Sequence, residues 1–217
     1  MKNTIIYRMT LLLLLITVSY VTFAQEAKKE IPLKYGATNE GKRQDPAMQK
    51  FRDNRLGAFI HWGLYAIPGG EWNGKVYGGA AEWLKSWAKV PADEWLKLMD
   101  QWNPTKFDAK KWVRAAKHAG MKYLVYTTKH HDGFAMYHSA CDKFNIVDAT
   151  PFKRDPMKEL AEACRKYGLG FGFYYSHNQD WTTPGASGAP KVDAEGNPKT
   201  FDDYFREKCL AQVEEIT

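Results

Sequence analysis

Three short segments of this chain end in side chains that can hydrogen-bond to a ligand or stack on it. They are FIHW at 59–62, TTKHHDGF at 127–134 and FYYSHNQDW at 173–181. Each is an apolar or aromatic run that passes into histidine, carboxylate or aromatic residues. A parallel sheet or barrel presents an active site in this way, because buried strands deliver polar groups to one edge. The mixture suits a sugar ring, which needs hydrogen bonds at its edges and an aromatic plane beneath its C–H face.

The most distinctive motif is HHDGF at 130–134. Neighbouring residues of a strand point to opposite faces, so both imidazoles share one site only if the strand ends there and the chain turns. Gly133 permits such a turn. We favour a pair of imidazoles that binds sugar hydroxyls. A zinc site and one buried structural histidine beside an exposed one remain open alternatives, although no HExxH spacing occurs.

Five further residues are considered for the same site. His61 directly follows a buried strand, and Glu82 beside Trp83 lies in a long loop rich in Gly and Trp. An acid next to an indole could bind hydroxyls and stack on a ring face, although a solvated acid beside a packed tryptophan is the alternative. Tyr174 and Tyr175 end the third segment, and one of the two rings is expected to face the site.

The elements that must position these residues alternate along the chain. Strands are expected over 57–62, 122–128 and 169–176. Helices are expected over 91–101, from Asp108 to Gly120, from Asp155 to Gly168, and from Asp202 onwards. Alternating helices and strands predict an α/β fold with a parallel sheet. The last helix has no following strand, so we expect the chain to be an amino-terminal part of a longer protein.

The first 24 residues resemble a secretory signal peptide. Lys2 and Arg8 precede the apolar run at 11–18, and Thr22-Phe23-Ala24 offers small residues before a cleavage point. The apolar run is too short to span a membrane comfortably. We therefore expect an exported protein, periplasmic or extracellular in a bacterium and lysosomal or extracellular in a eukaryote. Residues 25–50 are predicted to be a polar lead-in segment before the domain at 51–217.

Charge and cysteine content exclude some classes of function. The formal net charge of +6 is scattered among acids without a basic run, which argues against a nucleic-acid partner. The three cysteines Cys141, Cys164 and Cys209 are odd in number and lack metal-ligand spacing. We expect free thiols, with Cys164 buried on the apolar face of a helix.

These motifs resemble those of the alpha-L-fucosidases of glycoside hydrolase family 29. The resemblance covers residues 45–217, and the matching pieces are FIHWG at 59–63, EW at 82–83, KHHDGF at 129–134 and YYS at 174–176. It implies a (β/α)8-like TIM barrel of which this chain holds the first three to four units. An eight-unit barrel needs roughly 250 residues.

The resemblance also implies an activity and a set of sugar contacts. The whole protein would hydrolyse terminal alpha-L-fucosyl linkages of glycans with retention and without a metal or organic cofactor. The residues implied to contact fucose are His61, Glu82, Trp83, His130, His131 and Tyr174. The nucleophile, an aspartate in a Trp-x-Asp motif, and the general acid/base would both follow residue 217. The chain alone is therefore expected to be inactive, and a fucose-binding homologue without hydrolytic activity is the alternative.

Overall fold

The computed structural model describes residues 45–217. The expected signal peptide and nearly all of the lead-in segment lie outside these residues. The chain divides between Asp53 and Asn54 into two compact units, and each is described by itself. In the first, α2 spans Pro46–Asn54. Within the described part of the chain, no helix is both long and apolar enough to cross a membrane.

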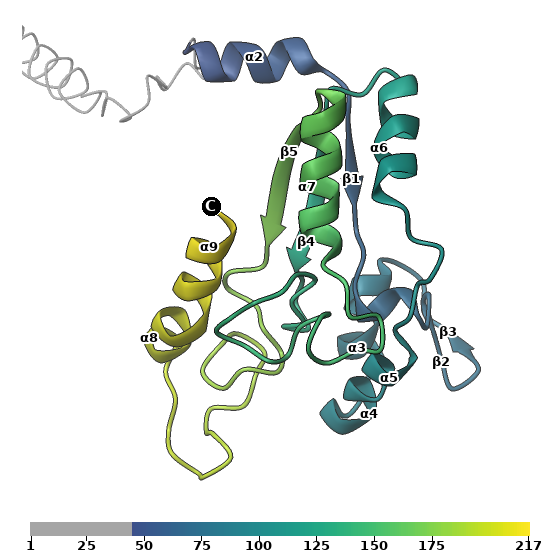
Figure 1. The fold of residues 1–217 in the computed structure, drawn as a ribbon. Helices are drawn as coiled ribbons and strands as arrows, with labels where there is room; N and C mark the ends of the chain where they lie inside the picture. Colours follow the sequence, from purple (N-terminus) through teal and green to yellow (C-terminus); the bar gives the residue numbers. More distant parts are fainter. Residues whose placement is uncertain (1–44) are drawn as a thin grey trace, which may run out of the picture. The chain divides into compact units, whose positions relative to one another are not determined.

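The second unit is built on a parallel sheet, as the alternating pattern predicts. Its strands are β1 (Gly57–Ile60), β4 (Tyr123–Lys129) and β5 (Gly170–Tyr175), in the order β1-β4-β5 (Figure 1). The register places Ala58 beside Leu124, and Leu124 beside Phe171. All three strands therefore finish at the same edge of the sheet.

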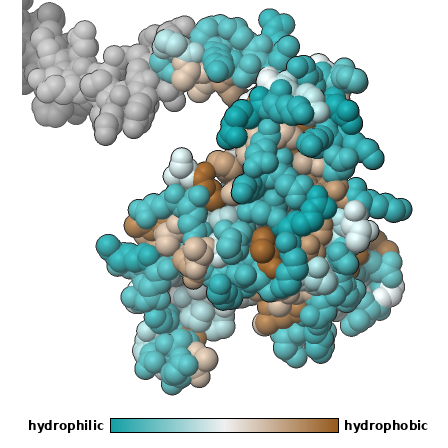
Figure 2. Space-filling model, in the orientation of Figure 1, coloured by the Kyte–Doolittle hydropathy of each residue, from teal (hydrophilic) through white to brown (hydrophobic). Residues whose placement is uncertain are grey.

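Two helices cover one face of this sheet (Figure 1): α6 (Ala109–His118) and α7 (Pro156–Tyr167). Their beginnings follow the expected capping chemistry. The carboxylate of Asp108 accepts the backbone N–H of Lys111 at 2.9 Å, and that of Asp155 accepts the N–H of Lys158 at 2.9 Å. Gly168 ends α7 in the left-handed conformation with φ 71°. Hydrophilic side chains dominate the outer surface over these helices (Figure 2).

One hydrophobic core joins the sheet to the two helices. Val113 of α6 and Leu160 of α7 are fully buried in the cluster that also contains Leu124 of β4. Cys164 is buried as expected, and all three cysteines are free thiols. The helical layer is thus anchored by aliphatic packing, which leaves the carboxyl ends of the strands available for polar groups.

The region expected as one long loop at 63–90 contains several short elements instead. The expected single helix at 91–101 is two short helices. The elements are η1 (Leu64–Ala66), β2 (Glu71–Trp72), β3 (Lys75–Val76), η2 (Ala81–Trp83), α3 (Leu84–Trp87), α4 (Ala92–Leu96) and α5 (Leu98–Gln101). Leu64, Leu84 and Trp95 are completely buried, so these elements are anchored in the core. The sequence pattern missed them because each is only two to five residues long.

The last helix is interrupted by a turn of π-helix. It runs through α8 (Phe201–Tyr204), the π-helical η3 (Phe205–Cys209) and α9 (Leu210–Ile216). The helix begins with a reciprocal cap between Thr200 and Asp203. A π-turn inserts an extra residue and changes which side chains face inward. Here Lys208 and Cys209 are buried.

A buried charge cluster joins this helix to the end of β4. Asp180 accepts ion pairs from Lys129 at 3.3 Å and from Lys208 at 3.1 Å, and Lys208 also meets Asp142 at 2.6 Å. Lys129 and Asp180 are completely shielded from solvent. Burial raises the pKa of Asp180, but the attraction of the two ammonium groups outweighs it and holds the pKa below its ordinary value. We call Lys129, Asp180, Lys208 and Asp142 the charge cluster.

We predict that Asp180→Asn strongly destabilises the chain. The change leaves two buried ammonium groups with a single carboxylate, and breaking a buried ion pair costs about 3–5 kcal/mol. Chemical denaturation of both proteins measures the difference in the free energy of unfolding. Asp202→Asn is the matched control, because its ion pair with Arg206 is exposed and should contribute little. Equal stability of the Asp180 and Asp202 variants would contradict a structural role of the cluster.

We also predict that Gly133→Ala is more destabilising than Gly120→Ala. Both glycines have positive φ, 81° and 83°, which costs an alanine about 1–2 kcal/mol. A β-carbon at Gly120 would meet nothing within 4 Å, whereas one at Gly133 would collide with Asp180 and Thr182. The difference between the melting temperatures of the two variants measures the cost of the collision at Gly133, because both variants share the cost of positive φ. Matching shifts in both variants would show that the turn adapts.

Candidate functional site

Three aromatic side chains from the three strand ends meet at one edge of the sheet. The ring of His130, after β4, lies 5.6 Å from that of His61, after β1, and 5.2 Å from that of Tyr174 in β5. The His61 and Tyr174 rings are 6.1 Å apart. This arrangement follows from the parallel register, because neighbouring strands end side by side (Figure 1).

Both histidines of the HHDGF motif belong to this cluster. Strand β4 ends at Lys129, and the chain then turns so that Gly133 donates its N–H to the carbonyl of His130 at 3.0 Å. The two imidazole rings therefore lie 4.2 Å apart instead of on opposite faces. Gly133 makes this turn with the positive φ for which glycine is suited.

Hydrogen bonds assign the tautomer of His131. Its Nδ1 lies 2.7 Å from the hydroxyl oxygen of Ser176, and that hydroxyl donates its only hydrogen to the carbonyl of Gln179 at 2.9 Å. Nδ1 must then be the donor to Ser176, which leaves Nε2 of the neutral ring as an acceptor. Ser176 thus makes His131 an acceptor of ligand hydrogens.

Glu82 and Trp83 reach the same site from the short helix η2. A ligand atom of Glu82, one of His61 and one of His130 all lie within 4.8 Å of one another. The indole of Trp83 meets the ring of His131 edge-on at 4.8 Å. The structure therefore brings all six sequence-predicted sugar contacts together, although Glu82 and Trp83 are separated from the next of them by more than 40 residues.

The electrostatics of the site favour neutral imidazoles. Burial, reinforced by His131, His61 and Lys129, lowers the pKa of His130 to about 3. Burial, with Lys129, also lowers the pKa of His131. At neutral pH these rings carry no charge and offer lone pairs. Beside the carboxylate of Glu82 they form a surface that accepts hydrogens, as the hydroxyl groups of a sugar require.

Two further aromatic residues border the site. Tyr65, which the sequence analysis did not single out, lies edge-on to His130 at 5.5 Å, and its buried hydroxyl has no hydrogen-bond partner within residues 45–217. Trp181 lies 5.5 Å from both His131 and Trp83. In the sequence, only the position of Tyr65 two residues after the FIHWG motif could have indicated that Tyr65 borders the site.

Other polar residues near this edge have structural partners instead. Asp132 is buried and accepts the indole N–H of Trp95 at 3.1 Å. Burial raises the pKa of Asp132 to about 6. The hydroxyl of Tyr175 donates to the side-chain oxygen of Gln212 at 2.8 Å. These contacts leave Tyr174, and not Tyr175, at the site.

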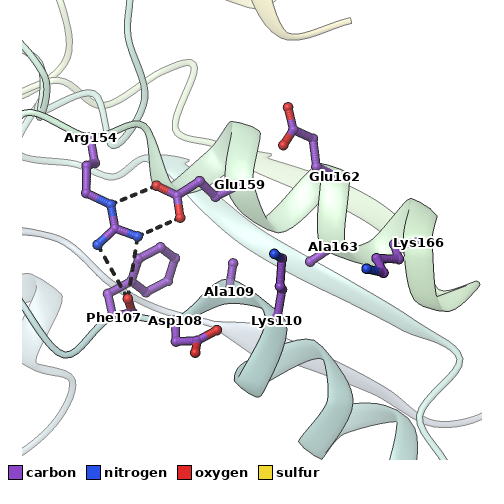
Figure 3. A pocket seen from close by; sticks show the side chains of 9 residues that line it. All are labelled: Phe107, Asp108, Ala109, Lys110, Arg154, Glu159, Glu162, Ala163 and Lys166. Atoms are coloured by element: carbon purple, nitrogen blue, oxygen red, sulfur yellow. Dashed lines mark hydrogen bonds and ion pairs between the residues drawn. The ribbon is translucent and has the colours of Figure 1, made fainter.

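A hollow of about 620 Å³ lies elsewhere, between the first turn of α6 and the part of α7 from Glu159 to Lys166 (Figure 3). Its guanidinium group, Arg154, is already held by Glu159 at 2.9 and 2.6 Å and by the carbonyl of Phe107 at 3.4 Å. The guanidinium group of Arg154 is therefore already paired with a carboxylate, which reduces its ability to bind a ligand. This hollow contains none of the six candidate residues, so we place the functional site at the strand ends.

Comparison with known proteins matches this arrangement to one family. The model of the family described as alpha-L-fucosidase matches residues 22–217. Plasma alpha-L-fucosidase of Rattus norvegicus is 34% identical over 162 residues, which are 66% of this chain and 33% of that protein. An alpha-L-fucosidase of Branchiostoma floridae is 29% identical over 84% of this chain and 41% of that protein. The chain thus spans less than half the length of these relatives.

Comparison with solved structures identifies the same family. An alpha-L-fucosidase of glycoside hydrolase family 29 from Bacteroides thetaiotaomicron is 62% identical, with a TM-score of 0.72 over 86% of this chain and 42% of that one. The fucosidase AlfC from Lactobacillus casei, solved with its product alpha-L-fucose, is 46% identical, with a TM-score of 0.71 over 77% of this chain and 57% of that one. The described residues therefore have the mixed α/β fold of these catalytic domains, and the chain belongs to the alpha-L-fucosidase family.

Proposed function

We propose that this chain forms the fucose-binding part of a retaining exo-alpha-L-fucosidase. The observation that carries the proposal is the convergence of six side chains from three strand ends and one loop in a member of this family. A similar bacterial fucosidase has been solved with an iminocyclitol inhibitor, and a family 29 alpha-L-fucosidase from Bacteroides thetaiotaomicron has been solved as a trapped covalent intermediate in complex with 2-fluoro-fucosyl fluoride. A terminal fucosyl group of a glycan or glycoconjugate is the corresponding ligand here.

The proposed binding mode follows from the lone pairs at the site. Glu82, His61 and His130 would accept hydrogens from the fucose hydroxyl groups, and Nε2 of His131 would accept another. The indole of Trp83 would pack on the apolar side of the sugar. Such contacts accelerate hydrolysis only as far as they tighten in the oxocarbenium-like transition state. A carboxylate and neutral imidazoles fit this need, because they accept more strongly as positive charge develops on the ring.

The chemistry itself requires residues that follow this chain. We propose that the three parallel strands are part of a (β/α)8-like barrel whose later strands carry the nucleophilic aspartate and the general acid/base. The proposed roles of this chain are to bind and orient the sugar. No metal or organic cofactor is needed for such a double displacement. Export from the cell is part of the same proposal.

Binding by the 217-residue chain is the first test. We predict that Glu82→Gln weakens binding of a fucose-like iminocyclitol by about 10- to 100-fold, since a hydrogen bond to a charged group contributes about 1.5–3 kcal/mol. His130→Ala removes a neutral acceptor, whose hydrogen bond contributes about 0.5–1.5 kcal/mol, and should weaken binding by about 2- to 10-fold. Titration of tryptophan fluorescence measures the affinity, because Trp83 borders the site. Glu162→Gln on the outer side of α7 is the control and should bind like the wild type. Equal affinity of all four proteins would contradict the proposed site.

Hydrolysis by the full-length protein is the second test. We predict that it releases fucose from an aryl alpha-L-fucoside with alpha configuration in the first product, as NMR would record during turnover. A chelator should leave the rate unchanged, and the chain of 217 residues should show no turnover. First formation of beta-fucose would disprove retention. Binding without hydrolysis by the full-length protein would identify a fucose-binding homologue.

A further inference from the structure

Three of the site residues bring one carboxylate and two imidazoles close together. Glu82, His61 and His130 come from three separate elements, and their ligand atoms lie within 4.8 Å of one another. Within the described residues, Glu82 has neither an ion pair nor a hydrogen bond. Nδ1 of His130 is buried without a partner, and 5% of that residue is exposed.

Such a group can bind a ligand that lies between its members. Each neutral imidazole has one lone pair beside its N–H, so two lone pairs and one carboxylate can together bind hydroxyl hydrogens or a cation. Fucose would supply hydroxyl hydrogens. Two imidazoles and one carboxylate are also the donor set found at catalytic zinc sites, where water takes the fourth position.

We infer that His61, Glu82 and His130 bind a divalent transition metal ion such as Zn²⁺ in the place of the sugar, so that the ion is a competitive inhibitor. The inference rests on the proposed function for the identity of the competing ligand, but the metal site itself depends only on the three side chains. No step of hydrolysis is assigned to the ion.

The geometry requires a modest closure of the three ligands. Zn–N distances of 2.0–2.1 Å in a tetrahedral site place ligand atoms about 3.3 Å apart. The present limit of 4.8 Å must therefore shorten. His61 is exposed, so its ring can move toward the others. His130 is held between the rings of Tyr174, at 5.2 Å, and Tyr65, at 5.5 Å, and provides the fixed ligand.

The ligand set also determines which ions can bind. Imidazole suits Zn²⁺, Cu²⁺ and Ni²⁺, whereas Ca²⁺ and Mg²⁺ prefer shells of oxygen ligands. His131 is not counted as a ligand, because the atoms that lie within 4.8 Å of one another belong to His61, Glu82 and His130. We expect a site selective for transition metals over Ca²⁺ and Mg²⁺.

Metal titration of the purified chain tests the inference. Isothermal calorimetry with Zn²⁺ should give one strong site per chain, and Co²⁺ should produce the visible absorption of a tetrahedral complex. His61→Ala and Glu82→Gln should each weaken Zn²⁺ binding at least about tenfold, since even the loss of an outer-shell partner costs 10- to 100-fold. His118→Ala, at the exposed end of α6, should bind as the wild type does. Undiminished binding in His61→Ala and Glu82→Gln would overturn the inference.

Competition separates this inference from the proposed function. A saturating fucose-like iminocyclitol should lower the apparent affinity for Zn²⁺ in proportion to its own occupancy, and Mg²⁺ should have no effect. If the iminocyclitol binds and Zn²⁺ does not, the metal site is wrong and the proposed function stands. If Zn²⁺ binds through these ligands and the iminocyclitol does not bind, the proposed function fails. Simultaneous binding without competition would overturn the shared site.

Discussion

The carboxylate of Asp180 is the interaction on which the geometry of this site depends. It lies between the ammonium groups of Lys129 and Lys208, and its other oxygen accepts the backbone N–H groups of Thr182 and Thr183. These contacts connect the end of β4, the loop after β5 and the π-helical turn. A buried charge is costly unless it is paired, so these three segments can move apart only at a high free-energy cost.

The charge cluster positions the proposed sugar contacts indirectly. Lys129 immediately precedes the two histidines, and the hydroxyl of Thr182 donates to the carbonyl of Asp132 at 3.2 Å. Trp181 donates its backbone N–H to the carbonyl of His131 at 2.8 Å, and its ring contacts those of His131 and Trp83. The turn that brings His130 and His131 together is therefore stabilised by the ion pair of Lys129 with Asp180 and by the aromatic packing of Trp181.

The same arrangement sets the electronic character of the site. Lys129 is close enough to disfavour a second positive charge on either imidazole, and burial acts in the same direction. Neutral rings and one carboxylate suit a ligand that carries hydroxyl groups and develops positive charge during reaction. They also leave unpaired lone pairs in the absence of a ligand. The proposed sugar binding and the inferred affinity for transition metals thus have one physical origin.

The sequence by itself determined the local features of this protein. Caps at Asp108 and Asp155 and the stop at Gly168 depend on residues within a few positions of one another, so they are readable from type and spacing. The parallel sheet was readable from the alternation of helices and strands. Tertiary structure alone decided that Tyr65 borders His130, that a π-turn buries Lys208, and that Asp180 joins two lysines. Those outcomes depend on contacts between residues far apart in the chain, and on which charges the assembled fold removes from water.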